Sequence, residues 1–258
     1  QRNEGMKKIA IVTGASSGMG RAFIFQLAEK YPKLEEIWAV ARRAEPMEQL
    51  QKEIKNAKIR LFPLDLKEEE SFGKISKALQ EEKPWAGVLV NGAGIGISGN
   101  FNEISEKEMT GMMDVNCRAL TRMTYLVLPY MRKGGQIYQF ASAAAFSPQP
   151  GFAVYAASKA YVLSFSMALR QELKEQGIRV TAVCPGPVKT EFLKKAYGNQ
   201  KISGYKRLVM ADCDRVVSCA VKDAKKGKAV SVYGMTMKLT RWICRIFPEE
   251  LIVRFFQS

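Results

Sequence analysis

Histidine is missing from all 258 residues of the sequence. Without an imidazole, the chain cannot assemble a Ser-His-Asp or Cys-His nucleophilic site, and it cannot hold zinc with histidine ligands. Proton transfer in any active site would therefore depend on Tyr, Lys, Asp, Glu or Cys side chains.

Cysteine is scarce and follows no recognisable pattern. The cysteines are odd in number and form neither a CxxC pair nor another spacing typical of a metal site: Cys117, Cys184, Cys213, Cys219 and Cys244. No export signal is visible before the first strand-like run. The sequence therefore predicts reduced thiols, no metal and a cytoplasmic location.

Long hydrophobic runs are also lacking. Apolar stretches such as Tyr125–Met131 are far shorter than the ~20 residues that a membrane-spanning helix requires. The overall balance of 47% apolar and 25% charged residues is that of an ordinary globular protein, which excludes intrinsic disorder. We expect a folded protein without a membrane span.

Acidic residues are few compared with basic ones. Forty Lys and Arg face 25 Asp and Glu, a net charge of +15, and residues 189–258 carry 15 basic and 6 acidic residues, which is +9 of the total. A solvated basic surface, an anionic ligand and an anionic membrane surface all remain compatible with this excess. Charge alone is no nucleic-acid recognition motif, so we expect no nucleic-acid partner.

Strand-like and helix-like segments alternate along the chain. Buried-type strands are predicted at Lys7–Thr13, Glu36–Ala41, Ile59–Leu64, Gly87–Asn91, Gln136–Ala141, Arg179–Cys184 and Ala229–Tyr233. Helices are predicted between them, notably Gly18–Lys30, Pro46–Asn56, Glu106–Arg132 and Val154–Gln176, the last closed by Gly177. Repeated strand–helix–strand units predict an α/β fold, a doubly wound parallel sheet with helices on both faces, in one domain spanning 1–258.

A glycine-rich loop follows the first predicted strand. Thr13-Gly-Ala-Ser-Ser-Gly-Met-Gly20 opens the first helix, whose N-terminal N–H groups can receive a pyrophosphate, and glycines allow its close approach. The residues expected to contact a dinucleotide here are Gly14, Ser16, Ser17, Gly18, Met19 and Gly20.

The end of the second strand indicates which dinucleotide is bound. Proteins that bind NAD usually carry an acidic residue there for the ribose 2′-hydroxyl, whereas this sequence has Arg42 and Arg43. Guanidinium groups bind phosphate well, so NADP(H) is favoured over NAD(H). Alternatively, both arginines are solvent-facing residues before the next helix.

Tyr155-Ala-Ala-Ser-Lys159 places a phenol and an ammonium on one face of a helix. A free tyrosine has a pKa near ~10 and is a poor base at neutral pH. A neighbouring lysine ammonium and an oxidised nicotinamide would both favour the phenolate, so Lys159 and the cofactor are expected to lower the pKa of Tyr155.

Six motifs in order resemble the short-chain dehydrogenase/reductase family over residues 6–235. They are the glycine loop, Asn91-Gly-Ala-Gly94, Asn116, Ser142, Tyr155-x-x-x-Lys159 and Pro185-Gly186-x-x-x-Thr190. The resemblance implies a seven-stranded Rossmann-type sheet and an oxidoreductase that transfers a hydride between a nicotinamide and a carbonyl or alcohol carbon. A cofactor-binding sensor without turnover is the alternative on the same fold.

The resemblance also implies roles for individual residues. Tyr155 would be the general acid/base, Lys159 would bind the nicotinamide ribose, and Ser142 would orient the substrate oxygen. Asn116 would hold a water that relays protons to Lys159, or would instead brace a helix kink. Further cofactor contacts are implied for Asp65, Leu66, Asn91, Ala93, Gly94, Pro185, Gly186, Val188 and Thr190. The usual second Asn of the family's Asn-Asn-Ala-Gly is Gly92 here, and Ala141 stands before the serine.

The segments around the expected site suggest a hydrophobic ketone or alcohol as substrate. Glu191–Tyr197 and the polar stretch through Gly204 and Tyr205 would form a lid. Apolar walls are expected from Phe146, Pro148, Pro150 and Phe152. A homodimer or homotetramer is expected through the helices that carry Asn116 and Tyr155.

Residues 236–258 extend beyond the family's usual core. Two apolar sets at helical spacing are flanked by basic residues and separated by Pro248: Leu239, Trp242, Ile243, Ile246 and Phe247, then Leu251, Ile252, Phe255 and Phe256. Such segments can lie on anionic lipid. Because this tail has only four basic against two acidic residues, packing on the substrate cleft or on another subunit is favoured instead.

Overall fold

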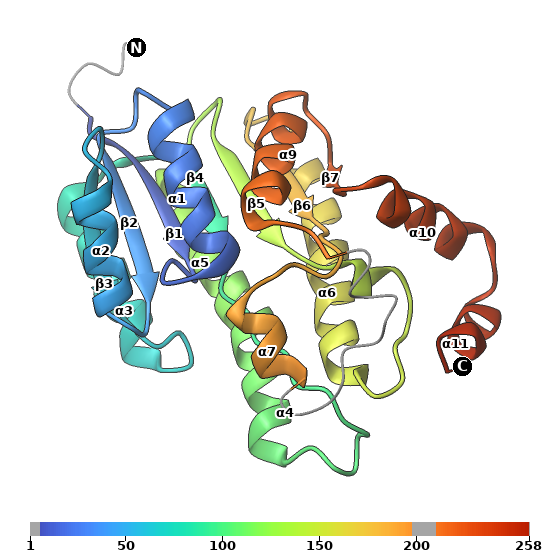
Figure 1. Ribbon diagram of the computed structural model, residues 1–258. Helices are drawn as coiled ribbons and strands as arrows, with labels where there is room; N and C mark the ends of the chain where they lie inside the picture. The colour runs from blue at the N-terminus through green and yellow to red at the C-terminus, as the bar shows by residue number, and fades with distance from the viewer. Residues whose placement is uncertain (1–5, 198–209, 258) are drawn as a thin grey trace.

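The computed structural model describes residues 6–197 and 210–257, and its strands form a single parallel sheet (Figure 1). The strand order is β3-β2-β1-β4-β5-β6-β7, which reverses between β1 and β4. The strands are β1 Lys8–Thr13, β2 Glu36–Ala41, β3 Lys58–Pro63, β4 Trp85–Asn91, β5 Gln136–Phe140, β6 Arg179–Val183 and β7 Val230–Ser231. The predicted doubly wound α/β fold is confirmed, and ligands in such sheets bind where the order reverses.

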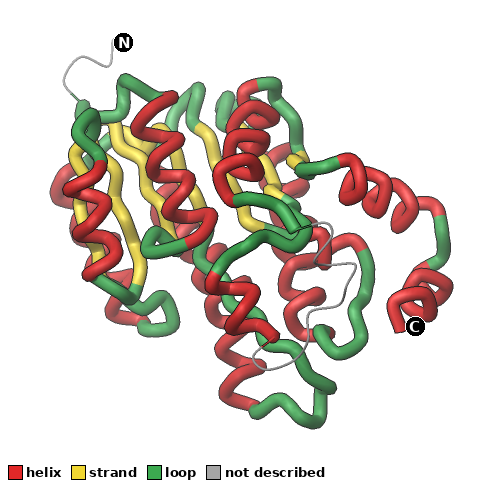
Figure 2. Tube along the Cα trace, viewed as in Figure 1, coloured by secondary structure: helices red, strands yellow, loops and turns green. Residues whose placement is uncertain are grey.

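Helices cover both faces of the sheet (Figure 2). One face carries α1 Gly18–Lys30, α2 Glu45–Glu53 and α9 Cys213–Lys225, and the other carries α3 Glu69–Glu82, α5 Leu120–Val127 and α6 Ala153–Glu172. Successive side chains of β1 point to opposite faces of the sheet and contribute to both hydrophobic cores. Ala10 and Val12 pack on the first face, and Ile9 and Ile11 pack on the second. Both layers are thus anchored to the strand beside the switch point.

The long helix predicted over Glu106–Arg132 is interrupted in the structure. It consists of α4 Glu106–Met113, a π-helical segment η1 Asp114–Ala119, α5, and a 3₁₀ turn η2 Leu128–Tyr130. Pro129 explains the last break, because its ring and missing N–H cannot continue an α-helix. The π turn widens the helix at Asn116, whose amide is tied to the backbone of Ile95.

Other boundaries differ by a few residues. The helix α6 ends at Glu172, and Gly177, with φ of +68°, closes the turn after it rather than the helix itself. Strand β7 is shorter than predicted because only Ala182 and Val183 of β6 pair with it.

The remaining elements lie around the carboxyl ends of the strands and in the tail. They are η3 Ala143–Phe146, α7 Glu191–Tyr197, α10 Met235–Ile246 and α11 Glu249–Gln257. The two tail helices form as predicted on either side of Pro248, and Figure 1 shows α10 leading away from the sheet. Within the described ranges 6–197 and 210–257, every helix is too short or too polar to cross a bilayer.

Candidate active site

A cavity of about 350 Å³ lies at the carboxyl ends of the strands. Its size suits a small-molecule or cofactor site. Nearly all residues singled out from the sequence line it: Gly14, Ser16, Ser17, Gly18, Met19, Gly20, Arg42, Arg43, Asp65, Leu66, Ala93, Gly94, Ser142, Tyr155, Lys159, Pro185, Gly186, Val188 and Thr190. Residues far apart in sequence therefore meet around one space.

The glycine loop packs so closely on neighbouring backbone that side chains would not fit at Gly14 and Gly20. Gly14 has φ of +70°, and a Cβ on it would lie 2.7 Å from the backbone of Gly92. A Cβ on Gly20 would overlap the carbonyl oxygen of Gly14. The hydroxyl of Thr13 accepts hydrogen bonds from the N–H groups of Gly92 and Ala93, both at 3.1 Å, and so joins the loops after β1 and β4. This backbone cradle at the start of α1 fits a pyrophosphate.

Arg42 and Arg43 also line the cavity, on the loop after β2. Arg43 Nη2 donates to Glu191 Oε2 at 2.9 Å, which links this loop to the first residue of α7. Both side chains of the pair are about half exposed, at 46% and 52%. The guanidinium groups of Arg42 and Arg43 suit an anionic group on a ligand. The Glu191 carboxylate, already paired with Arg43, would compete with that group.

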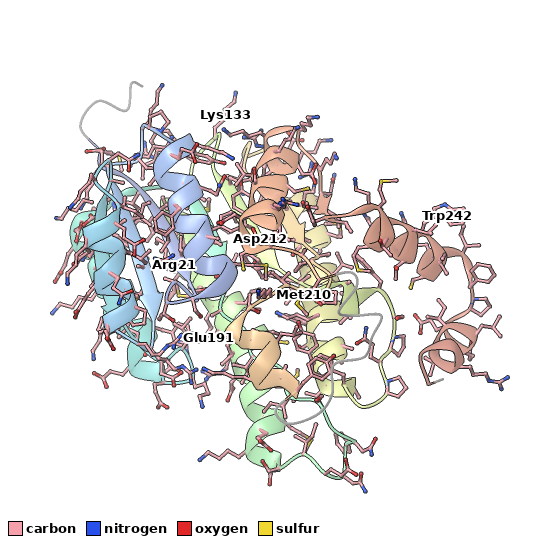
Figure 3. The ribbon with its side chains drawn as sticks, viewed as in Figure 1. Arg21, Lys133, Glu191, Met210, Asp212 and Trp242 are labelled. Carbon is pink, nitrogen blue, oxygen red and sulfur yellow. The ribbon has the colours of Figure 1, made fainter. Side chains whose placement is uncertain are left out.

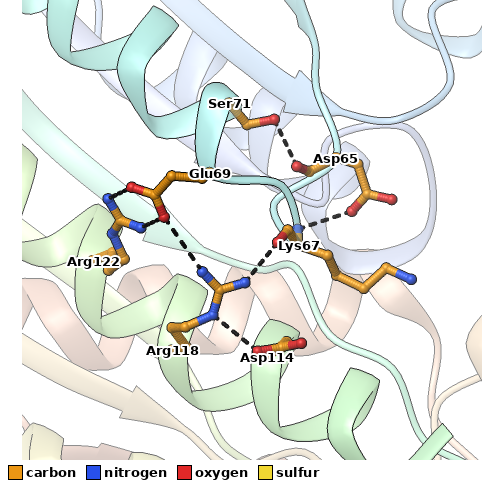
Figure 4. A network of polar contacts seen from close by, with 7 residues as sticks. All are labelled: Asp65, Lys67, Glu69, Ser71, Asp114, Arg118 and Arg122. Atoms are coloured by element: carbon orange, nitrogen blue, oxygen red, sulfur yellow. Dashed lines mark hydrogen bonds and ion pairs between the residues drawn. The ribbon is translucent and has the colours of Figure 1, made fainter. Parts of the chain in front are cut away.

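The loop after β3 is held in place by a polar network, shown in Figure 4. Asp65 Oδ1 accepts from the Lys67 N–H at 3.0 Å, and Arg118 of η1 donates to the Lys67 carbonyl at 2.6 Å. Arg118 also pairs with Asp114 at 2.9 Å, while Glu69 pairs with Arg122. The π-helical segment thereby positions the loop that brings Asp65 and Leu66 to the cavity.

Asn91 and Asn116 are the two predicted site residues that do not line the cavity. The Asn91 amide is buried and donates to Thr124 Oγ1 and Gln139 Oε1, both at 2.9 Å, so its side chain braces the sheet against α5. These contacts occupy the side-chain amide of Asn91, and its expected cofactor contact stays a prediction.

Asn116 is fully buried in the π turn. Its Oδ1 accepts from the Ile95 N–H, and its Nδ2 donates to the Ile95 carbonyl and to Ser158 Oγ, each at 2.9 Å. These contacts agree with the alternative in which Asn116 braces a helix irregularity. Its proposed water relay to Lys159 stays a prediction.

Ser142, Tyr155 and Lys159 meet in the wall of the same cavity. Ser142 follows β5 and precedes η3, and its hydroxyl accepts a hydrogen bond from the Ala144 N–H at 3.1 Å. The Ser142 side chain is also hydrogen-bonded to the Tyr155 phenol. Lys159, one turn after Tyr155 on α6, donates to the Phe140 carbonyl at 2.8 Å. Its ammonium lies 5.7 Å from the centre of the Tyr155 ring.

Burial dominates the electrostatics of this group. Burial raises the pKa of Tyr155 to about 12, and the hydrogen bond with Ser142 lowers it only in part. Burial likewise lowers the pKa of Lys159 to about 8. Among the protein's own groups, the cost of burying a phenolate outweighs nearby favourable contacts, and the lowering expected from Lys159 together with an oxidised nicotinamide stays a prediction. The protein's own groups keep Tyr155 protonated at neutral pH.

We expect Lys159→Met to stabilise the protein more at pH 7 than at pH 10. The folded-state pKa of about 8 lies below the ~10.4 of an unfolded lysine, so between these values the unfolded chain binds more protons. The free energy of unfolding of the wild type therefore rises with pH in this window. At 1.36 kcal/mol per pKa unit, the extra stability of Lys159→Met over the wild type should be about 2–3 kcal/mol smaller at pH 10 than at pH 7.

Urea unfolding at both pH values measures this difference. The exposed Lys174→Met is the matched control and should show no such pH dependence. An advantage of Lys159→Met that stays constant from pH 7 to pH 10 would mean that Lys159 titrates like an exposed lysine.

Aromatic side chains enclose Tyr155. Phe152 stacks on its ring with centroids 4.3 Å apart, and Phe192 of α7 lies 5.7 Å away. Gly96 faces this cluster, where a Cβ would come within 2.8 Å of Phe192. Of the apolar walls expected from the sequence, Phe152 lines the cavity, whereas Phe146, Pro148 and Pro150 do not.

The lid prediction is tested only in part. Glu191–Tyr197 forms α7 and contributes Glu191, Phe192, Leu193, Lys195 and Tyr197 to the cavity wall. The predicted continuation through Gly204 and Tyr205 lies outside the described residues.

Several lining residues were not predicted individually, among them Gly96, Met237 and Thr240. Glu191 was expected only as part of the lid, and its pairing with Arg43, 148 positions away, has no local signal in the sequence. Gly96 could have been noticed as an additional glycine shortly after the Asn91–Gly94 motif. Met237 and Thr240 come from the tail, whose contacts depend on how α10 packs.

Comparisons with known proteins agree with this geometry. The family model described as short chain dehydrogenase matches residues 8–201. A serine 3-dehydrogenase of Agrobacterium fabrum is 30% identical over 240 residues, which cover 90% of this chain and 94% of that protein.

Solved structures are similar over nearly the whole chain. A short-chain dehydrogenase from Sphingobium yanoikuyae in complex with NADPH has a TM-score of 0.78 and 27% identity, covering 92% of each chain. A short chain dehydrogenase/reductase from Burkholderia phymatum in complex with NAD has a TM-score of 0.80, covers 98% of this chain and 97% of that one, and at 18% identity shows the shared fold. With the cradle, the Ser142, Tyr155 and Lys159 group and the family match together, the chain belongs to the short-chain dehydrogenase family of oxidoreductases that use a nicotinamide dinucleotide.

Proposed function

We propose that the protein transfers a hydride between NADP(H) and the carbonyl or secondary alcohol carbon of a hydrophobic substrate. The observation that carries this proposal is one cavity lined by two chemically different groups of residues. Arg42 and Arg43 supply cations in its wall, and Ser142, Tyr155 and Lys159 supply a proton donor and its neighbours.

The residues of the chain handle the substrate oxygen and its proton. When bound, the nicotinamide supplies or accepts the hydride. In the reductive direction Tyr155, kept protonated by its raised pKa, donates its phenolic proton to the carbonyl oxygen. Ser142, already hydrogen-bonded to the phenol, orients the same oxygen. Lys159 would bind the nicotinamide ribose, while the backbone cradle around Gly14 would hold the pyrophosphate.

The preference for NADP(H) rests on Arg42 and Arg43 at the cavity. A guanidinium binds a 2′-phosphate through charge-assisted hydrogen bonds, which a 2′-hydroxyl cannot match. The similar Sphingobium yanoikuyae protein was solved with NADPH, which supports the same preference here.

We expect Glu191→Gln to tighten NADPH binding by about 1.4- to 5-fold, because an exposed ion pair is worth about 0.2–1 kcal/mol. In the wild type, the 2′-phosphate must compete with Glu191 for Arg43. NADH affinity should change far less. Fluorescence titration with both cofactors measures the effect, and Glu103→Gln, on an exposed loop, is the control. Equal tightening of both cofactors would contradict competition at Arg43.

The substrate preference rests on the apolar side chains near Tyr155. Phe152, Phe192 and Leu193 line the cavity, the first two beside the Tyr155 ring, and an apolar substrate gains free energy by burying its surface there. The similar serine 3-dehydrogenase is named for a small polar substrate, so the test must include one. Oxidation of NADPH followed over aliphatic, aromatic and steroid-like ketones and small polar carbonyls should show the highest kcat/KM for the apolar set. Preference for polar carbonyls would contradict this part.

The same proposal includes assembly and domain organisation. Residues 6–235 would form the catalytic domain, with 236–258 as its extension. A homodimer or homotetramer would form through α5 and α6, where Tyr125 and Tyr161 are 78% and 41% exposed. Light scattering on the wild type and on Tyr125→Lys tests this interface. A lysine buried between subunits would destabilise their contact, so the molar mass of the particle in solution should fall.

A further inference from the structure

The helix α10 carries an apolar face that points away from the protein. Met235, Leu239, Trp242 and Ile246 are 78%, 56%, 59% and 54% exposed. Their spacing of four, three and four residues places them on one side of the helix. Only Met237 and Thr240 of the tail line the cavity, so these four apolar side chains do not cover the cleft, and their packing on another subunit stays a prediction.

The opposite side of α10 attaches it to the domain. Met237 is buried against Gly186, where an added Cβ would lie 2.5 Å from its sulfur, and Thr240 reaches the cavity wall. Arg241 lies over the Phe146 ring at 5.8 Å. Because these contacts hold the helix, its outward apolar face is not used by the fold. Figure 3 shows Trp242 at the outer rim of the molecule.

The exposed apolar residues extend in sequence past the end of α10 and beyond Pro248. Of the eleven large apolar side chains that are exposed among the described residues, seven lie between positions 235 and 251. They are the four named above together with Ile243, Phe247 and Leu251. Concentration of this kind marks an interaction surface, since scattered residues would need no partner. We call these seven residues the α10 face.

Basic residues select the partner. Lys238, Arg241 and Arg245 lie along one flank of α10, at spacings of three and four. A second copy docked through the same face would oppose these cations with their own equivalents, in a chain whose net charge is already +15. An anionic lipid surface instead complements the charge and also receives the apolar side chains, with tryptophan suited to the interface.

We propose that the α10 face docks the protein onto anionic membranes as a peripheral, non-spanning contact. The cavity would then lie beside the lipid surface, because Met237 and Thr240 of the same helix line its wall. A substrate dissolved in lipid could enter from there. This last consequence rests on the proposed function, whereas the docking itself does not.

Vesicle co-sedimentation of the full chain tests the docking. We expect binding to phosphatidylcholine–phosphatidylglycerol vesicles, weaker binding to phosphatidylcholine alone, and loss of binding at high salt. Trp242→Ser with Ile246→Ser should weaken binding by about tenfold or more, whereas Phe101→Ser, an equally exposed aromatic elsewhere, should not. Lys238→Gln with Arg245→Gln should weaken binding to anionic vesicles more than Lys52→Gln with Lys107→Gln.

Tryptophan fluorescence gives a positive signal. Trp38 is fully buried and Trp85 half-buried, so a blue shift on adding vesicles would report mainly Trp242. Trp242→Phe should abolish the shift and retain most of the binding.

Two results would overturn the proposal. One is no vesicle binding by the wild type; if the Trp242→Ser, Ile246→Ser variant then also has a lower oligomeric mass, a second copy covers the face. The other is unchanged vesicle binding by that variant. NADPH binding and ketone reduction without vesicles are measured separately, so failure of the proposed function is recognised independently.

Discussion

Tyr155→Phe should lower kcat for ketone reduction by about 10²–10⁴-fold, the usual contribution of a positioned general acid. The variant keeps the ring that stacks on Phe152 and loses only the hydroxyl that carries the transferable proton. NADPH affinity and KM should therefore change little. Stopped-flow oxidation of NADPH, with cofactor affinity from fluorescence titration, separates these quantities.

The matched control for this variant is Tyr161→Phe on the same helix. Tyr161 is hydrogen-bonded to Thr121 on the surface and does not line the cavity, so its removal should leave turnover unchanged. Turnover of Tyr155→Phe within about tenfold of wild type would remove Tyr155 from the role of general acid.

Arg42→Ala combined with Arg43→Ala should weaken NADPH binding by roughly 10- to 100-fold, because one lost charge-assisted phosphate contact costs about 1.5–3 kcal/mol. NADH lacks the 2′-phosphate, so its affinity should stay nearly constant. The enzyme would then lose its discrimination between the two cofactors. Isothermal titration with each cofactor measures the ratio directly.

A control is needed because the double variant also removes two positive charges from the protein. Lys52→Ala with Lys174→Ala removes the same charge from exposed positions outside the cavity and should leave both affinities nearly unchanged. Equal losses for NADPH and NADH in the arginine variant would show that the arginines support the loop after β2 and do not recognise the phosphate.

The two arginine effects are linked through Glu191. Since Glu191 already holds Arg43 at 2.9 Å, the affinity measured for NADPH includes the cost of breaking that pair. Removing the arginines should therefore also cancel the benefit of Glu191→Gln. Such non-additivity is expected of groups in direct contact.

The fold was largely predictable because its signals are local. Each β-branched apolar run, the glycine loop at Gly14–Gly20 and the proline and glycine boundaries act over a few residues, and parallel strands with crossover helices admit few topologies. Nineteen of the twenty-one predicted site residues line the cavity, since the motifs lie where strands end at one edge of the sheet.

Features that depend on distant partners could not be predicted. The π turn at Asn116 reflects its bonds to Ile95, and the place of Asn91 reflects Thr124 and Gln139, which only the packed sheet brings near. The direction of the Tyr155 pKa shift depends on complete burial, which a motif does not report. A pKa follows the total environment of a group, and spacing to one lysine describes a small part of it.

The tail shows the same limit most clearly. Helical spacing alone predicted the apolar faces of residues 236–258 and the break at Pro248, because periodicity is a property of the chain. Which face of α10 meets the domain was decided by the fit of Met237 on Gly186, a contact between residues 51 positions apart. Amphipathicity states that a face needs a partner, whereas packing and charge in three dimensions decide whether that partner is the protein itself or something outside it.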